Sequence, residues 1–410
     1  MISTDQDRHN GWIFSICYIL TYLSAPVLYI DVVQASLLDK LGASPTVANL
    51  PASTYMFGQI APLFVCWLVP HRLERSMVVW ANIATAAFIG IVFASLAVPV
   101  PDEVRIAALT LQGLLQGLSG STSFVFMMQC LRRGTSEPGL ARALKRTFGV
   151  TPLAAVAGSL GAQYVLNPGF ASLPYPYDFA LLYLLAMPCS AGIAAAASRF
   201  HLEPIEEKVR PPYVHYLGRT LRGFGTDRRM LSLWIAYVFW YAAISVMSNL
   251  TLYTRVATGA DPKDYSGLMM AIRFGTKAAA GVALGMLAVR YGLRAGVMGT
   301  LVLAMTAAVW GWSVPGWAFL LTFGLMGGAE LGGVYQPNYV SRLSTPSEST
   351  MNLAMMTLAT PVSSFAPVLH GFLATHLGFP ASFLASGLFA ATALWLVWVR
   401  GDSSPSGANP

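Results

Sequence analysis

Long apolar runs separated by short polar connectors dominate the sequence. A helix needs about 20 apolar residues to cross the hydrocarbon core of a bilayer, and runs of this length recur along the chain. The runs are continuous rather than alternating, which favours helices over the strands of a membrane β-barrel. The pattern predicts an all-α membrane protein with twelve spans, at residues 12–36, 49–69, 77–97, 105–131, 144–166, 179–198, 230–255, 265–289, 295–313, 317–341, 351–375 and 380–399.

One connector is long and polar, and it divides the predicted helices six and six. We therefore expect an N-terminal six-helix bundle (1–198), a cytoplasmic linker (199–229), a C-terminal six-helix bundle (230–400) and a polar tail (401–410). The two halves also share a weak sequence repeat. In each half the end of a predicted span is followed by a basic turn and then by a helix with an early Pro and a late Gly. A parallel repeat of two six-helix halves is typical of transporters.

Composition and charge support this interpretation. The chain is 55% hydrophobic and 10% charged, with a mean hydropathy of +0.57, whereas a soluble domain carries about 25% charged residues. If the N-terminus is cytoplasmic, 19 of the 25 Lys and Arg residues fall on the cytoplasmic side and 4 on the outer side. The positive-inside rule then places both termini in the cytoplasm. The net charge of +7 is thus a topology signal of a plasma (inner) membrane protein, and it does not indicate nucleic acid binding.

The stretch Gly285-Met-Leu-Ala-Val-Arg-Tyr-Gly-Leu-Arg294 ends the predicted span 265–289. It resembles the cytoplasmic loop motif of the major facilitator superfamily, G-x-L-a-D-r-x-G-r-r, in its second-half copy. The acidic position holds Val289 instead. The positions that fit are Gly285, Leu287, Ala288, Arg290, Gly292 and Arg294. The resemblance implies two six-helix bundles that rock about a central solute site.

Other signatures of the superfamily are only partly present. In the first-half copy of the loop motif Arg75 fits, whereas Pro70 takes the acidic position and Leu73 replaces the second Gly. Gly113 stands where antiporters of the family carry an Arg, and 158–161 lacks their Gly-Pro step. These departures disfavour a multidrug exporter.

Two basic residues lie inside the predicted span 265–289. Ionisable groups within a membrane cost several kcal/mol unless they face a cavity or a partner, so they are functional candidates. Arg273 lies about 12 Å from the outer end of its helix, near the bilayer midplane, and Lys277 shares its helical face. The Arg fork matches a carboxylate or phosphate. Arg273 is therefore a candidate anchor for an anionic solute, with an ion pair to a neighbouring helix as the alternative.

Two acidic residues complete the set of candidates for coupling or gating. Glu330, between glycines that permit close packing or bending, lies about 20 Å from the outer end of its helix, a depth close to that of Lys277. We expect a Glu330–Lys277 pair that is either static or opens to let Glu330 carry a proton. Asp31, about 28 Å along its helix, is expected at the outer rim, as an interfacial residue near Lys40 or as an outward gate.

Uncharged side chains could also contact a solute, although most aromatic residues in membrane helices pack or form interface belts. Trp240 and Tyr241 could stack on a ring. The full set of such substrate-binding candidates is Gln59, Tyr237, Trp240, Tyr241, Asn249, Tyr335 and Asn338.

These predictions converge on a secondary transporter. The predicted spans bury two positive charges and one negative charge, which favours a small organic anion as the solute. We expect transport by alternating access, with proton coupling as one form of the hypothesis. The chain contains no phosphate-binding GxxxxGK[ST] loop, no metal-ligand or cofactor motif and no catalytic constellation, so we expect a monomeric non-enzyme without cofactors in the lipid bilayer. The alternatives are a proton-coupled exporter of amphipathic compounds and a membrane sensor on the same scaffold.

Overall fold

The computed structural model describes residues 4–167, 173–203, 213, 218, 225–344 and 349–400. Within these ranges the regular structure is helical. Most of the predicted linker 199–229 and all of the predicted tail 401–410 lie outside the described residues.

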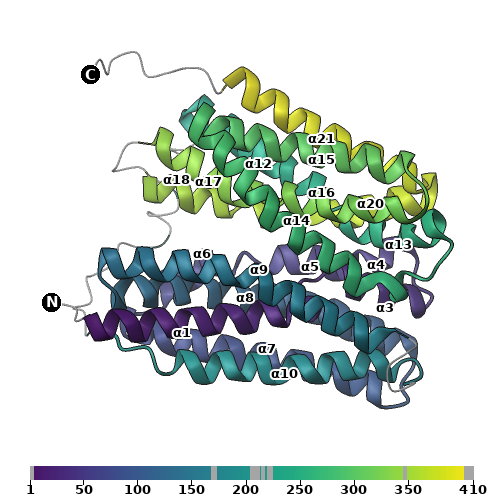
Figure 1. Cartoon of the computed structure of the whole chain (residues 1–410), viewed down its shortest axis with the longest axis horizontal. Helices are drawn as coiled ribbons and strands as arrows, with labels where there is room; N and C mark the ends of the chain where they lie inside the picture. The colour runs from purple at the N-terminus through teal and green to yellow at the C-terminus, as the bar shows by residue number, and fades with distance from the viewer. Residues whose placement is uncertain are drawn as a thin grey trace.

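The helices gather into two stacks, one above the other in Figure 1. We call described residues 4–203 the N-half and 225–400 the C-half. The elements of the N-half are α1 (Thr4–Leu23), α2 (Ala25–Leu28), α3 (Val32–Lys40), α4 (Pro45–Ala48), α5 (Leu50–Gly58), α6 (Ala61–Leu68), η1 (His71–Leu73), α7 (Glu74–Ala97), α8 (Asp102–Gly134), α9 (Glu137–Leu166) and α10 (Tyr177–Ala197).

The C-half repeats this design with more interruptions. Its elements are α12 (Arg228–Ile244), α13 (Met247–Thr258), α14 (Pro262–Tyr291), α15 (Leu293–Ser313), η2 (Gly316–Leu320), α16 (Leu321–Ala329), α17 (Gly332–Leu343), α18 (Ser349–Thr357), α19 (Ala359–Val362), η3 (Ser363–Phe365), α20 (Ala366–Leu377) and α21 (Phe379–Arg400).

Eight stretches of described helix are long and apolar enough to cross a membrane. Several other predicted spans are broken into shorter helices. The segments α2, α6 and α20 each carry a proline as their second residue, at Pro26, Pro62 and Pro367. Proline lacks the N–H that would continue the preceding helix. The break after α16 falls at Glu330–Leu331, just before Gly332.

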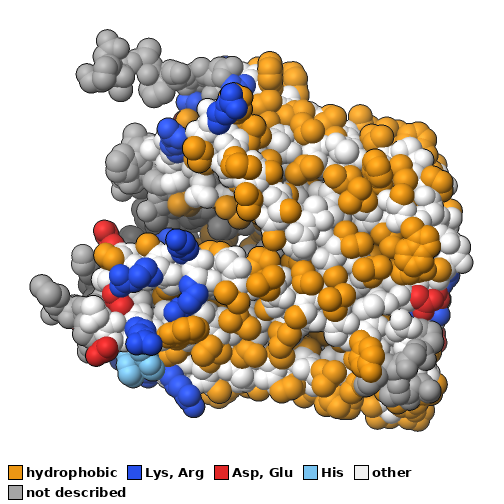
Figure 2. Space-filling model, in the orientation of Figure 1, with side chains coloured by type: hydrophobic (Ala, Val, Ile, Leu, Met, Phe, Trp, Pro, Cys, Tyr) orange, Lys and Arg blue, Asp and Glu red, His pale blue; other side chains and the backbone are white. Residues whose placement is uncertain are grey.

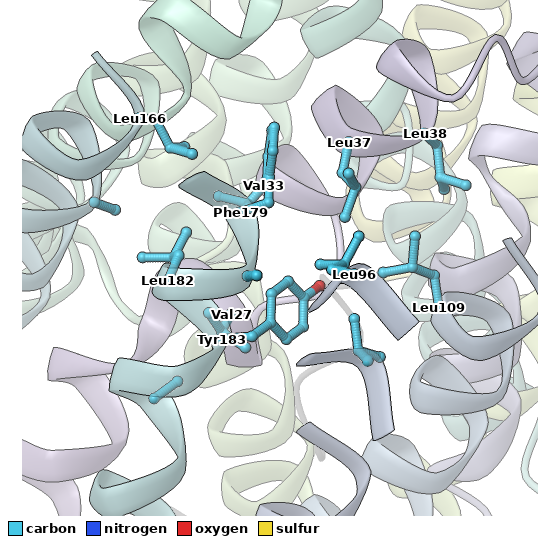
Figure 3. Packing of buried hydrophobic residues seen from close by; sticks show 14 of the residues in the cluster. Val27, Val33, Leu37, Leu38, Leu96, Leu109, Leu166, Phe179, Leu182 and Tyr183 are labelled. Carbon is cyan, nitrogen blue, oxygen red and sulfur yellow. The ribbon is translucent and has the colours of Figure 1, made fainter. Parts of the chain in front are cut away.

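Each half has its own apolar core. In the N-half, α3, α7, α8 and α10 contribute side chains such as Leu37, Leu96, Leu109 and Tyr183 to one buried cluster (Figure 3). In the C-half, Phe319, Phe323, Phe383 and neighbouring side chains form a comparable cluster. The two clusters also take in side chains of the other half, Leu252 in the first and Ala25, Val32 and Ala155 in the second, so apolar packing also joins the halves.

The halves meet at one end of the molecule. We call it the closed end, marked by Lys40 at the end of α3 and Pro262 at the start of α14, and we call the opposite end, where α1 begins and α21 ends, the terminal end (Figure 1). Hydrogen bonds between the halves at or toward the closed end include Ser36–Ser266 (2.6 Å), Asn49–Asn249 (2.7 Å) and Thr46–Thr375 (2.9 Å). Toward the terminal end the halves diverge, and the surface is hollowed between them (Figure 2).

Glycine brings two backbones into contact across the interface. A Cβ atom on Gly267 of α14 would lie 2.3 Å from the Gln163 nitrogen and 2.4 Å from the Ser159 oxygen of α9. The side chain of Gln163 reinforces this crossing, because its Oε1 accepts from Leu268 N–H at 2.9 Å. Any larger residue at 267 would have to push the halves apart.

We predict that Gly267→Ala lowers the free energy of unfolding by about 1–3 kcal/mol, the usual range for overpacking a tight contact. The matched control is Gly275→Ala on the same helix, where the added Cβ would meet only Val156 at 3.9 Å. Thermal unfolding in detergent measures both. Equal stability of the two variants would show that the α9–α14 crossing tolerates a side chain.

Candidate functional site

Four charged side chains meet at the interface of the halves. Asp31 belongs to the N-half and caps the start of α3, as the last of the non-helical residues 29–31. Arg273 and Lys277 lie one turn apart on α14, and Glu330 caps the end of α16. We call these four residues the charge cluster.

The contacts within the charge cluster form one continuous network. Arg273 Nη1 donates to Asp31 Oδ2 at 2.7 Å, and its Nε and Nη2 reach Glu330 Oε1 at 2.6 and 2.5 Å. Lys277 Nζ donates to Glu330 Oε2 at 2.8 Å. The second Asp31 oxygen accepts from Val32 N–H at 2.6 Å. All four carboxylate oxygens are therefore bonded, and the formal charges sum to zero.

Burial makes this network energetically demanding. The Arg273 side chain is 6% exposed and that of Glu330 is 10% exposed. Removing two charges from water costs several kcal/mol per ion, and their attraction compensates only when the geometry is good and the remaining groups are bonded. A buried network of this kind is weak evidence for stability, which favours a role in function.

Aromatic rings line the other side of Arg273. Its guanidinium carbon lies 5.5 Å from the centre of the Tyr29 ring and 5.8 Å from that of Phe274. Those two rings meet edge to face at 5.2 Å, and Tyr22 packs against both. The rings offer cation–π attraction and keep water from one side of the guanidinium.

Glycine lets α16 approach α14 closely enough for the network to form. A Cβ atom on Gly327 would lie 2.1 Å from the Arg273 carbonyl oxygen. On the far side, Trp240 of α12 donates from Nε1 to the Ala329 carbonyl at 3.0 Å. The close packing expected from the glycines around Glu330 is confirmed.

The predicted Lys277–Glu330 pair is present. Arg273 forms an ion pair with neighbouring elements, as the alternative interpretation expected, and it binds both Asp31 and Glu330. The expected position of Asp31 was wrong. Asp31 was placed at the outer rim near Lys40, yet Lys40 binds Asp261 instead. The error came from counting depth along an unbroken helix, while the chain breaks at 24 and again at 29–31. With Asp31 included, the deep charge is balanced rather than net positive.

The aromatic candidates on α12 form a buried stack. Tyr237 and Trp240 are 4% and 2% exposed, with ring centres 5.3 Å apart and nearly parallel planes. Tyr241 is partly buried, and its hydroxyl lies 3.3 Å from that of Tyr237. In this conformation Tyr237 and Trp240 support the α16–α17 break rather than offer a free surface.

Both the Nδ2 and the Oδ1 atom of Asn249 form hydrogen bonds. Its Nδ2 donates to the His370 carbonyl (2.7 Å) and to Ser382 Oγ (2.8 Å), while its Oδ1 accepts from Asn49 (2.7 Å). Asn249 thus ties α13, α20 and α21 to the N-half. Sequence reasoning missed Asn49 because a single Asn in an apolar run gives no sign of its distant partner.

Among the described contacts, none of the remaining candidates forms a hydrogen bond or ion pair with the charge cluster. Gln59 caps the end of α5 and is partly buried. Tyr335 packs on α15, where a Cβ on Gly296 would lie 2.8 Å from its ring, and exposed Asn338 donates to the Val334 carbonyl of its own helix. Their proposed contact with a solute stays a prediction.

The loop motif forms the turn between α14 and α15. Gly292 has φ +90°, a conformation that side chains disfavour. Arg290 is exposed over the Tyr291 ring, and Arg294 donates to the Trp398 carbonyl at 2.6 Å. Gly285 faces the Tyr335 hydroxyl.

A second set of ion pairs joins the halves at the closed end. Asp261 accepts from Lys40 and Arg255, Arg255 also reaches Asp39 at 2.6 Å, and Lys263 binds Asp178. Burial alone would raise the pKa of Asp261, but the Lys40 hydrogen bond and its other cationic and N–H partners bring that pKa below its usual 3.8. Asp261 is therefore ionised at neutral pH, and this contact between the halves is charged.

Comparison with known proteins places the fold. No family model and no curated protein sequence matches the chain. The solved structure of a point mutant of the nucleoside transporter NupG is similar with a TM-score of 0.71 at 11% identity, over 96% of this chain and 99% of that one. A bacterial homologue of the human lysosomal transporter Spinster, inward-facing and unoccupied, gives 0.68 at 13% identity, over 98% and 100%.

A D-xylose–proton symporter gives a TM-score of 0.66 at 13% identity, over 96% of each chain. At such identities the likeness shows the fold alone. The chain has the integral membrane fold of major facilitator superfamily transporters, as the loop motif and the repeat predicted.

We predict that Asp31→Asn lowers the free energy of unfolding by about 3 kcal/mol, because it leaves a buried Arg under-compensated. Asn keeps the shape of the side chain and the bond to Val32 N–H. The control is Asp39→Asn on the same helix, whose partner Arg255 is 51% exposed; such exposed pairs contribute about 0–1 kcal/mol. Equal losses in denaturant unfolding would refute a special cost at Asp31.

Proposed function

We propose that the chain is a secondary transporter of a small organic anion that works by alternating access. The observation that carries the proposal is the buried bond between Asp31 of the N-half and Arg273 of the C-half. This bond can persist only while the halves touch at that depth. It therefore links the charge state of the interface to the position of the halves.

The proposal includes the predicted topology: twelve spans in two bundles, 1–198 and 230–400, with linker and termini in the cytoplasm. The closed end then faces outward and the hollow of Figure 2 faces the cytoplasm, so the structure is an inward-facing state. The ion pairs Lys40–Asp261, Asp39–Arg255 and Asp178–Lys263, which join the halves at the closed end, would seal the outer side.

The anionic class of the solute follows from what Arg273 needs when Asp31 leaves. Glu330 occupies Nε and Nη2, whereas Nη1 binds Asp31 and contacts the Met270 sulfur only weakly, at 3.6 Å. Parting the halves at the closed end would take the carboxylate away from that arm, and an arginine that loses its partner in a weakly hydrated site is costly. A carboxylate on the solute can replace Asp31 at this arm, since the Arg fork matches carboxylate geometry.

We propose that proton binding is coupled to the movement of the halves. A proton on Asp31 would cancel its charge and release Arg273, whereas Glu330 is held by two cations. We therefore assign proton coupling to Asp31, and to Glu330 and Lys277 the role of holding Arg273 in place. The D-xylose–proton symporter shares the fold and is proton-coupled by its name, which shows that such coupling is compatible with this fold.

We predict that proteoliposomes take up a labelled carboxylate from a panel of anions and cations, faster with a pH gradient. Arg273→Gln should reduce the uptake at least about 100-fold, because it removes a buried charge contact worth about 3 kcal/mol. Asp31→Asn should retain exchange but lose the response to the gradient. The control is Arg105→Gln, whose ion pair to Asp102 and hydrogen bond to the Ser95 carbonyl both lie within the N-half.

Three outcomes would overturn parts of the proposal. Unchanged uptake in the Arg273 variant would remove the anion anchor. Uptake of cations alone would favour an exporter of amphipathic compounds. An absence of flux for every solute, together with a partner captured through 199–229, would favour a sensor on the transporter scaffold.

A further inference from the structure

A pocket of about 550 Å³ opens between α1 and α9 at the terminal end. It lies away from the charge cluster, and the proposed transport does not use it. Three arginines line it, Arg8 from α1 and Arg142 and Arg146 from α9, together with the Trp12 ring. Arg8 and Arg142 are exposed, so their charges are open to a ligand.

The single carboxylate in the described lining is already bonded. Asp7 is 6% exposed and accepts from Ser136 N–H at 2.7 Å and from Ser136 Oγ at 2.5 Å. Arg142 reaches it only at 3.5 Å, and the Arg142 side chain remains 68% exposed. The pocket thus keeps a formal excess of two positive charges, which favours an anion.

Arg146 and Trp12 form the inner wall. Arg146 donates from Nε to Ser15 Oγ at 3.0 Å, and its guanidinium carbon lies 3.9 Å from the centre of the Trp12 ring. Stacking and this single bond fix the guanidinium while leaving donors on Nη1 and Nη2. Such a fork suits phosphate oxygens.

The same helix faces continue as apolar stripes. Along α9, residues spaced three or four apart from Arg146 lead to Val150, Leu153 and Leu160, which are 40, 70 and 50% exposed. Residues at this spacing share one face of a helix. Side chains that are apolar and exposed in the closed part of a membrane fold face lipid.

Helix α1 shows the same order. From Arg8 and Trp12 its exposed face passes to Ile16 and Leu23, which are 43% and 41% exposed. In Figure 2 the basic side chains of the lower half gather at the left, at the edge of an apolar surface that extends to the right. A positive pocket therefore lies at the end of two exposed apolar stripes, one on α1 and one on α9.

We propose that this pocket binds the headgroup of an anionic phospholipid. The arginines contact the phosphodiester, the Trp12 indole sits at the level of the interface, where Trp is favoured, and an acyl chain lies against the apolar stripes of α1 and α9. Basic pockets between helices on the cytoplasmic side are suited to such headgroups. A zwitterionic headgroup also brings a cation, for which the described lining offers no unengaged carboxylate.

Native mass spectrometry of the purified full chain tests the proposal. The protein is released from neutral detergent after incubation with equal amounts of phosphatidylglycerol and phosphatidylcholine. We expect about tenfold preferential retention of phosphatidylglycerol, since each surface Arg adds to the attraction for an anionic lipid. The triple variant R8Q/R142Q/R146Q should lose the preference.

Lys145→Gln is the matched control, because Lys145 is exposed on α9 but does not line the pocket; it should keep the preference. If the control and the triple variant lose the preference for phosphatidylglycerol equally, that preference comes from general surface charge, and the proposed site is wrong. Equal retention of both lipids by the parent protein would also overturn it.

A double variant and a thermal-shift measurement complete the test. If the triple variant misfolds, R8Q/R142Q removes the two exposed arginines and should still halve the preference; no change would contradict the proposal. A thermal shift with phosphatidylglycerol but none with inorganic phosphate is expected. An equal shift with inorganic phosphate would mean that the pocket binds free phosphate and needs no acyl chain.

Discussion

The bond between Asp31 and Arg273 is the contact on which the arrangement of the two halves depends. It is buried, it joins elements more than 200 residues apart, and it holds an arginine that also binds Glu330. The ion pairs at the closed end add to it: those of Arg255 are exposed and contribute little each, whereas Lys263–Asp178 is largely buried. A buried pair is different because breaking it from one side leaves an uncompensated charge in a low-dielectric setting.

Two helix breaks and one glycine bring these charges together. The chain breaks at 29–31, so that Asp31 caps α3 and points across the interface. Gly327 lets α16 touch α14, and the α16–α17 break places Glu330 beside both Arg273 and Lys277. An unbroken, Ala-rich version of these helices would be more regular, but it could not hold four charges in contact.

The fold was largely predictable from the sequence, whereas the site was predictable only in part. Hydropathy and the loop motif at Gly285–Arg294 depend on local spacing, and they indicated the helical membrane class and the fold. The Lys277–Glu330 pair followed from matched depths. Asp31 was misplaced because helix breaks are set by tertiary contacts, and depth counting assumes none. The Asn49–Asn249 bond was missed because neither residue has a periodic signal.

The central claim is that the Asp31–Arg273 bond holds the halves together at the closed end. Pulsed electron paramagnetic resonance between spin labels at Val98 and Trp312 tests it directly. Both side chains are exposed, at 52% and 56%, and they lie at the closed end on opposite halves. The account predicts one short-distance population in the parent protein and an added longer-distance population in Asp31→Asn. Superimposable distance distributions would contradict it.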